Sequence, residues 1–214
     1  MLKPDLTAPV VTVLASGSPR RTELLKEFGI EHIIIKATTE ESFTSSDPER
    51  MVKGLAIAKA YNVCDMIKKN PSLKGEGSGS SCIIAADTLV FLDGKELGKP
   101  ADREESRSMI KSLSGRDHEV WTGVCILVTE PDGEPAYEDT FAERTFVHVK
   151  ELTDEEIDGY VASGEGDDKA GAYAIQGEFG KFIDRFVGSR NNVIGLPAEK
   201  VAEKLKEIGV IQAP

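Results

Sequence analysis

The feature that most restricts the fold is a pair of apolar runs in which polar residues do not alternate with apolar ones. From Val10 the sequence reads VVTVLAS, and from Ile83 it reads IIAADTLVF. A strand that is apolar on both faces has to be covered on both faces, which is typical of central strands in α/β proteins. The chain is therefore expected to place helices on both sides of a sheet.

Helix signals follow the first strand and recur along the chain. Ser18 and Pro19 are favourable residues for a helix start, and Gly29 can end that helix in the left-handed conformation. EHIIIKA then reads as a second strand. Asp47 and Pro48 open the long amphipathic stretch ERMVKGLAIAKAYNVCDMIKK. The first half of the chain thus predicts alternating strands and helices.

The second half predicts hairpins as well as helices. Asp93 and Gly94 mark a tight hairpin, and the turn PDGE separates the strand-like runs HEVWTGVCILVTE and TFAERTFVHV. Asp102 and Thr153 each open a helix, and a last helix follows Pro197. We expect a mixed α/β sheet with helices on its faces, built as a single domain over residues 1–214, with the Gly/Ser-rich stretch 75–81 as a loop insertion.

Composition limits the functional classes. No apolar run approaches the roughly 20 residues of a membrane helix, and the N-terminus lacks the pattern of a secretory signal, so we expect no membrane contact and a cytoplasmic location. The net charge of −11 argues against binding extended nucleic acid but leaves a small anionic substrate open. Cys64, Cys82 and Cys125 are widely spaced and predicted to be free thiols.

Two arginines stand where a helix disfavours cations. In LASGSPRR, Arg20 and Arg21 fall in the first helical turn, where a cation is disfavoured by roughly 0.3–1 kcal/mol. A bound anion would remove this conflict, because helix N–H groups, the Ser16 hydroxyl and the guanidinium groups converge there. Phosphate is the natural candidate. The alternative is that the arginines reach solvent or pair with Glu23 and Glu27.

Two further charged residues occupy apolar positions. Asp87 interrupts a buried strand and needs a cation, a metal or hydrogen-bond donors, unless it bonds to the backbone of a neighbouring loop. Lys59 lies midway between Leu55 and Val63 on the apolar stripe of the long helix. It either extends to the surface or meets a buried partner. Ligands of open α/β sheets bind at the carboxyl ends of strands, which favours a functional Asp87.

Lys99 and Gln176 complete the candidate residues. Lys99 is held between Gly98 and Pro100, although such turns are also common on surfaces. Gln176 lies in GEGDDKAGAYAIQGEFGKFI, where a fixed carboxamide could read the N–H and C=O edge of uracil or thymine, or could be structural in a glycine-rich hairpin. The three histidines are far apart, so a metal would be held by oxygen ligands, which suits Mg²⁺ or Mn²⁺.

Taken in order along the chain, the motifs resemble those of the Maf family of nucleotide pyrophosphatases. They are LASGSPRR, LAIAKA, AADTLV, LGKP, SGRDHEVWTGV, DKAGAYAIQGEFGKFI and NNVIGLP. The resemblance covers nearly the whole chain and implies a fold related to the inosine triphosphate pyrophosphatases, with an elongated mixed central sheet. The chain departs from the family pattern at the 75–81 insertion and in GSRNN, around Arg190.

The resemblance also implies roles for individual residues. Asp87 is implied as the proton acceptor and, with Glu40, as a ligand of a divalent cation, although Glu41 is an equally close alternative to Glu40. The residues implied to contact phosphate are Ser16, Arg20, Arg21, Lys59 and Lys99. The residues implied to distinguish the subgroups of the family are Arg20, Thr88 and Gln176. Their combination is similar to that of the group that hydrolyses dTTP and UTP.

The sequence therefore predicts an enzyme that hydrolyses a pyrimidine nucleoside triphosphate to its monophosphate and pyrophosphate, with Mg²⁺ or Mn²⁺ as cofactor. Two alternatives stay open: a regulatory nucleotide-binding protein linked to cell division, and a pyrophosphatase that prefers another modified or purine nucleotide. The choice among UTP, dTTP, CTP and modified pyrimidines also stays open. A homodimer is implied by the family alone.

Overall fold

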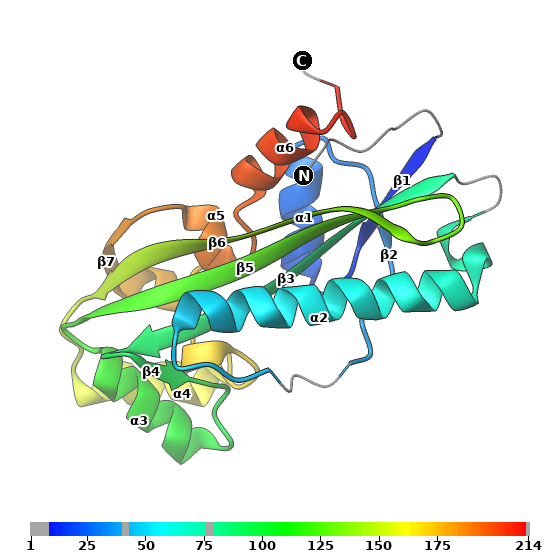
Figure 1. Cartoon of the computed structure of the whole chain (residues 1–214). Coiled ribbons are helices and arrows are strands. Elements are labelled where there is room, and N and C mark those ends of the chain that lie inside the picture. Colours follow the sequence, from blue (N-terminus) through cyan, green and yellow to red (C-terminus); the bar gives the residue numbers. More distant parts are fainter. Residues whose placement is uncertain (1–8, 40–42, 76–78, 213–214) are drawn as a thin grey trace. The chain divides into compact units, whose positions relative to one another are not determined.

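The computed structural model describes residues 9–39, 43–75 and 79–212 (Figure 1). The chain divides into two compact units. Unit 1 comprises Met1–Asp87, Gly123–Ala142 and Gly195–Pro214, and unit 2 comprises Thr88–Thr122 and Glu143–Ile194.

A mixed β-sheet confirms the expected fold class. Its strands are β1 Val10–Leu14, β2 Ile33–Ile34, β3 Ser80–Leu92, β4 Lys95–Leu97, β5 Asp117–Thr129, β6 Pro135–Val149 and β7 Ile183–Val187. They are ordered β2-β1-β3-β5-β6-β7, and β4 pairs with β3. β1 runs parallel to β2 and β3, whereas β4 is antiparallel to β3 and β7 to β6. The hairpin between β3 and β4 turns at Asp93 and Gly94, both with positive φ, as the sequence predicts.

The predicted helix starts are confirmed. The helices are α1 Pro19–Glu27, α2 Pro48–Lys69, α3 Arg103–Leu113, α4 Asp154–Ser163, α5 Arg190–Ile194 and α6 Ala198–Glu207, with short 3₁₀ helices η1 Pro71–Lys74, η2 Ala170–Ala172 and η3 Glu178–Phe182. Asp47 caps α2 by accepting from two backbone N–H groups, and Thr153 and Glu156 form a complete capping box at α4. Among the described residues, no helix combines the length and apolar character needed to cross a membrane.

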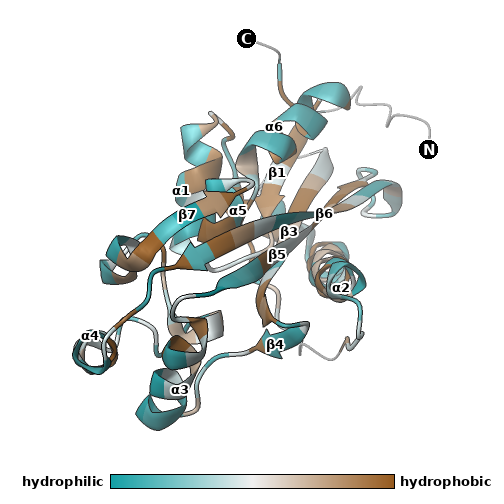
Figure 2. Ribbon diagram, turned by 90° about the vertical axis from the view of Figure 1, so that its left-hand side faces the viewer, coloured by the Kyte–Doolittle hydropathy of each residue, from teal (hydrophilic) through white to brown (hydrophobic). Residues whose placement is uncertain are grey.

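In unit 1, helices cover both faces of the strands, as expected for strands that are apolar on both faces. Val13 and Ala15 pack with α2 residues such as Ala56 and Val63 in one buried cluster. Leu14, between them in sequence, is fully buried outside that cluster. Successive side chains of a strand point to opposite faces. Figure 2 looks along α2 and shows α1 and α6 on the other side of the strands of this unit.

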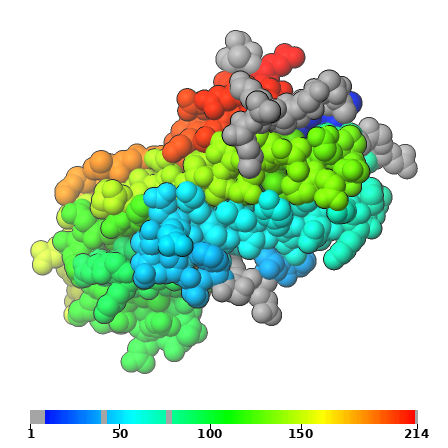
Figure 3. Space-filling model, viewed as in Figure 1, coloured from blue at the N-terminus to red at the C-terminus, as the bar shows by residue number. Residues whose placement is uncertain are grey.

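The β5–β6 end of unit 1 packs closely on α2. Figure 3 shows the side chains of α2, in cyan, lying against those of β6, in yellow-green. Tyr61 donates to a Glu138 carboxylate oxygen at 2.9 Å, and the Cys64 thiol donates to the Gly133 carbonyl at 3.4 Å. Gly123 of β5 touches the backbone of α2, since a Cβ there would lie 2.2 Å from the Val52 carbonyl oxygen. Glycine is therefore required at this contact.

The core of unit 2 is built around aromatic residues. Phe179 is completely buried and contacts Tyr160, Tyr173 and Phe182, with ring centroids 4.7 to 5.7 Å apart. Aliphatic side chains of α3 and α4, including Ile110, complete this cluster. The glycine-rich segment around Gln176 is thus attached to a well-packed core.

Three segments differ from the sequence expectation. β2 is only two residues long, although EHIIIKA predicts a longer strand. The stretch 75–81, expected to be a loop insertion, ends before Ser80, which begins β3 and lies opposite Val10 of β1. The region 164–183 forms η2 and η3 and not a glycine-rich hairpin. Pairing with β1 extends β3 to Ser80, and the packing of Phe179 and Phe182 in the core of unit 2 fixes the region 164–183.

The three cysteines are free and buried. Burial raises the pKa of the Cys82 and Cys125 thiols to about 12, so both remain protonated at neutral pH. They are inert parts of the core, as the sequence indicates.

Candidate active site

The turn between β1 and α1 holds one of its two arginines in a defined position. Arg21 donates from Nε to the Gly195 carbonyl at 2.8 Å and from Nη1 to the Ser16 hydroxyl oxygen at 3.1 Å. The Ser16 oxygen also accepts from the Ser18 backbone N–H at 3.2 Å. The Ser18 side chain does not cap the helix, although the sequence makes it a favourable cap. The structure therefore brings Ser16 and Arg21 together at the start of α1.

Two other cationic residues lie close to this turn. Arg20 is half-buried in the first turn of α1. Lys36, which follows β2, lies with its aliphatic chain over Gly17, because a Cβ at Gly17 would be 3.3 Å from its Cδ. Sequence reasoning missed Lys36. Its position just after a strand, where α/β proteins bind ligands, is the signal that could have identified it.

Lys59 and Asp87 form a buried ion pair in unit 1. Lys59 Nζ donates to Asp87 Oδ1, and their side chains are only 15% and 7% exposed. Helix periodicity places Lys59 on the buried face of α2, and β3 places Asp87 in the interior. The sequence identified both residues separately, and the structure shows that they are partners. An ammonium group has three donors, so Lys59 can hold Asp87 and still contact an oxygen of a ligand.

One described carboxylate of this site could contribute to the binding of a divalent cation. Glu40 and its alternative Glu41 lie outside the described residues, so the structure does not distinguish them. Asp87 provides a buried carboxylate, and Mg²⁺ is commonly held by one or two carboxylates together with substrate phosphates. In the described part of the chain, no three histidine, cysteine or acidic side chains are grouped as a metal site of their own. Asp87 is thus the described carboxylate that could hold a cation together with a phosphorylated ligand.

Thr88 belongs to unit 2 and is the only residue of β3 that is not buried. Its hydroxyl oxygen lies 2.9 Å from that of Thr122 on β5. Thr122 is completely buried and donates to the Asn192 carbonyl of α5 at 3.2 Å. Sequence reasoning did not select Thr122 or Asn192, although both lie in motifs of the family, VWTGV and NNVIGLP.

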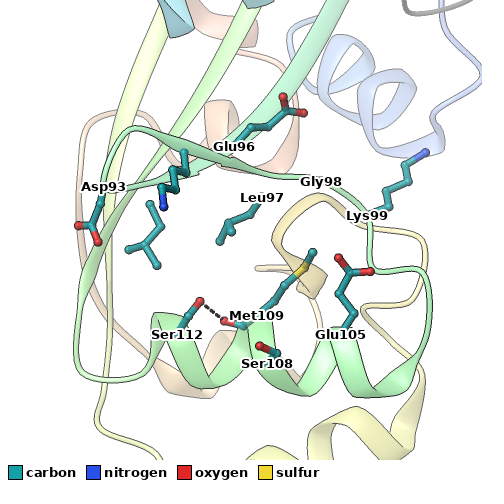
Figure 4. Close-up of a pocket in the computed structure, with 11 residues that line it drawn as sticks. Asp93, Glu96, Leu97, Gly98, Lys99, Glu105, Ser108, Met109 and Ser112 are labelled. Atoms are coloured by element: carbon teal, nitrogen blue, oxygen red, sulfur yellow. Dashed lines mark hydrogen bonds between the residues drawn. The ribbon is translucent and has the colours of Figure 1, made fainter. Parts of the chain in front are cut away.

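Lys99 extends from a turn that is fixed by the glycine-rich segment. The Gly98 carbonyl accepts from Gly171 N at 3.0 Å. A pocket of about 470 Å³ lies between this turn, β4 and α3, and Lys99 points away from it (Figure 4). The pocket lining includes Asp93, Glu96 and Glu105, which outnumber its lysines. We therefore do not place phosphate groups in this pocket.

Gln176 is exposed, and the backbone just after it is held by hydrogen bonds to the carboxylate of Glu165. Glu165 accepts from the backbone N–H groups of Glu178 at 2.7 Å and Phe179 at 3.3 Å. Gly177 lies directly against that carboxylate, since a Cβ there would be 2.1 Å from Glu165 Oε2. The backbone that follows Gln176 is therefore fixed by these contacts with Glu165. Glu165 was not selected from the sequence, because its partners lie 13 and 14 residues away.

His118 lies in the buried core of unit 2. It is 2% exposed, and its Nε2 lies 2.7 Å from the Tyr173 hydroxyl oxygen. Burial lowers the pKa of His118 to about 4, so the ring is neutral at neutral pH.

The candidate residues thus fall into separate sets within the two units. In unit 1, Ser16 contacts Arg21 and Lys59 contacts Asp87. In unit 2, the candidates are Thr88, Lys99 and Gln176, carried by β3, the turn after β4 and the segment before η3. Their common role stays a prediction.

Comparison with known proteins gives a consistent result. A family model described as Maf-like protein matches residues 12–208. A protein of Agathobacter rectalis named dTTP/UTP pyrophosphatase is 40% identical over 92% of this chain and 97% of its own length. Proteins of the same name are 42% identical in Thermoanaerobacter pseudethanolicus (91% of this chain, 94% of theirs) and 40% in Bacillus anthracis (92% and 95%).

Proposed function

The chain belongs to the Maf-like protein family, and we propose that it is a pyrophosphatase that hydrolyses dTTP and UTP to the monophosphate and pyrophosphate. The observation that carries this proposal is the buried Lys59–Asp87 pair, in which a carboxylate able to accept a proton is held by an ammonium group able to bind phosphate. The names of the relatives supply the class of reaction and substrate.

In the proposed reaction, Asp87 accepts a proton from a water molecule that attacks the α-phosphorus. A bond forms between the water oxygen and this phosphorus, the bond to the oxygen bridging the α- and β-phosphorus breaks, and pyrophosphate leaves. Lys59 keeps the Asp87 carboxylate in place through its ion pair. Held in this position, Asp87 is oriented before substrate arrives.

Cationic and hydroxyl groups of unit 1 are proposed to bind the phosphate chain. Arg21 and Ser16 are fixed to each other and to the backbone at Gly195, so they offer a rigid anion site at the start of α1. Arg20 lies in the same helical turn. Bound phosphate would also offset the unfavourable position of these cations at a helix N-terminus. Lys99 of unit 2 is proposed as a further phosphate contact on the family resemblance.

A divalent cation, Mg²⁺ or Mn²⁺, held by Asp87 and Glu40, would neutralise phosphate charge and lower the pKa of a bound water molecule. Arg20, Thr88 and Gln176 are proposed to select the base. A carboxamide both donates and accepts hydrogen bonds, so Gln176 can pair with the N–H and C=O edge of uracil or thymine.

The main test is the variant Asp87→Asn, which removes the proton acceptor but retains the shape of the side chain. We expect kcat for UTP with Mg²⁺ to fall by about 100-fold or more. Asp65→Asn, an exposed change on α2, is the matched control and should retain full turnover. Since removing one partner of a buried ion pair costs about 3–5 kcal/mol of stability, folding and UTP binding are measured in parallel.

Two outcomes would favour the other readings. Saturable UTP binding without turnover by the unmodified protein favours a regulatory nucleotide-binding protein linked to cell division. A purine or modified nucleoside triphosphate hydrolysed clearly faster than UTP and dTTP favours a pyrophosphatase of different specificity. Full turnover by Asp87→Asn removes Asp87 from the mechanism.

The proposal includes a cytoplasmic location and a homodimer. Three free, buried cysteines suit a reducing compartment. The homodimer rests on the family resemblance, and analytical ultracentrifugation would test it.

A further inference from the structure

A chain of hydroxyl groups in unit 2 leads from Thr88 into the interior. The Thr88 and Thr122 hydroxyl oxygens are 2.9 Å apart, and the Thr122 hydroxyl lies 3.2 Å from the Asn192 carbonyl oxygen. Thr122 and Asn192 are completely buried, whereas Thr88 is half-buried. Thr88 is therefore the outer end of the chain.

Each hydroxyl group has one hydrogen to donate, and this fixes which group donates in each hydrogen bond. A carbonyl oxygen only accepts, so the single hydrogen of the Thr122 hydroxyl is donated to Asn192. If that hydrogen pointed to Thr88 instead, the Thr122 and Asn192 oxygens would face each other with their lone pairs in a buried place, which is unfavourable. Between the two threonines, only Thr88 can then donate.

The inner end of the chain is firmly anchored. The Asn192 side-chain amide donates to the Val120 carbonyl and to the Thr145 hydroxyl oxygen, each at 3.0 Å. Its backbone N–H donates to the Ser189 hydroxyl oxygen at 3.1 Å, and the Thr145 hydroxyl donates to the Ser189 carbonyl at 2.9 Å. These bonds hold α5 against β5 and β6, so the Asn192 carbonyl keeps its direction toward Thr122.

We infer that Thr122 is a positioning residue that commits the Thr88 hydrogen to the protein interior, so that the Thr88 oxygen offers only lone pairs to a nucleotide. This inference rests on the proposed function, in which Thr88 contacts the substrate. The matching group on the substrate is a hydrogen-bond donor. Uracil and thymine carry such a donor at the imide N3–H, where cytosine has an acceptor, and the sugar hydroxyl groups are the other donors of the nucleotide.

The test compares kcat/KM for UTP, CTP and dUTP in Thr122→Val and Thr122→Ser. Valine has the shape of threonine without the hydroxyl, so the Thr88 hydroxyl loses this acceptor and its hydrogen is no longer directed to the interior. If the imide is the partner, the preference for UTP over CTP should shrink about fivefold, mainly through KM, as expected for one hydrogen bond. If the 2′-hydroxyl of the sugar is the partner, the ratio of UTP to dUTP should change by this amount. Thr122→Ser should restore the ratio of the unmodified protein.

Controls separate this inference from the proposed function. Thr129→Val changes another buried threonine of β5, whose hydroxyl serves the Ser81 backbone N–H, and should alter neither ratio. If Thr88→Val shifts a ratio and Thr122→Val shifts none, the directional role of Thr122 is wrong and the role of Thr88 stands. If Thr88→Val also shifts none, Thr88 is not a substrate contact and both ideas fail. Should Thr122→Val not fold, Thr122→Cys, with a weakly hydrogen-bonding thiol, takes its place.

Discussion

At the residue scale, the Lys59–Asp87 pair explains two side chains that would each be costly alone. Both lie in the interior of unit 1, and a buried charge without a partner strongly destabilises a fold. Even when two buried charges are paired, they often stabilise the folded protein no more than well-packed apolar residues in the same positions would. A chain that retains both residues gains little stability from them. This is consistent with a role in binding and proton transfer.

For these two residues, the sequence predicts which side chains are unusual but not that they form a pair. The apolar stripe of α2 and the apolar run of β3 were enough to identify Lys59 and Asp87 as unusual. Their pairing was not predictable, because it depends on how α2 packs on β3, 28 residues away. Thr122 and Glu165 were missed for the same reason. Their partners come from distant segments, and neither residue is unusual within its own stretch of sequence.

Glu165→Ala tests the hydrogen bonds that fix the backbone after Gln176. The Glu165 carboxylate accepts two backbone hydrogen bonds, and its loss leaves the N–H groups of Glu178 and Phe179 without this partner. We expect the free energy of unfolding to fall by about 2 kcal/mol in urea denaturation. Asp167→Ala, an exposed change in the same loop, should have little effect. Equal stability of the two variants would show that the hydrogen bonds to Glu165 do not contribute to the free energy of unfolding.

At the scale of elements, the sequence predicts best where local signals and packing agree. The caps at Asp47 and Thr153 and the turn at Asp93 depend on neighbouring residues, and the structure has all three as expected. The segments η2, η3 and β7 were not predicted. Glycine-rich sequence permits many conformations, and the one adopted here is selected by Phe179 and Phe182 packing into the core of unit 2.

Two glycine-to-alanine variants test the packing of elements. Gly123→Ala places a Cβ 2.2 Å from the Val52 carbonyl oxygen, so β5 and α2 must move apart. We expect a loss of about 3 kcal/mol in unfolding free energy. Gly159→Ala lies within α4 and meets no atom within 4 Å, so it should stabilise the protein by about 0.5–1 kcal/mol. Thermal and urea denaturation of both variants measure this contrast, and a neutral Gly123→Ala would contradict the described contact.

At the scale of the whole molecule, the net charge affects which ligands can bind, and the buried His118 affects how stability depends on pH. A net charge of −11 repels polyanions, so an anionic substrate has to be bound by locally arranged cations such as Arg21 and Lys59. The buried neutral His118 adds a pH dependence to stability. In the folded protein its pKa is about 4, below the 6.5 of an ordinary histidine. Between these values, the unfolded chain binds a proton that the folded chain does not.

His118 should therefore make the protein less stable as the pH falls from about 6.5 to about 4, by about 3 kcal/mol across that range. Urea denaturation at pH 7.5 and pH 5 measures the loss. His118→Gln cannot titrate at this position and should show a smaller loss than the unmodified protein. An unchanged pH dependence in His118→Gln would assign the effect to other groups.

In the proposed reaction, water attacks the α-phosphorus of UTP and dTTP. The most direct measurement is hydrolysis with Mg²⁺ in ¹⁸O-labelled water, followed by mass spectrometry of the products. We expect equal amounts of monophosphate and pyrophosphate, with the label in the monophosphate. Label in pyrophosphate would mean attack at the β-phosphorus, and release of orthophosphate with a nucleoside diphosphate would mean cleavage of a different bond. Either result would exclude attack of water on the α-phosphorus with release of pyrophosphate.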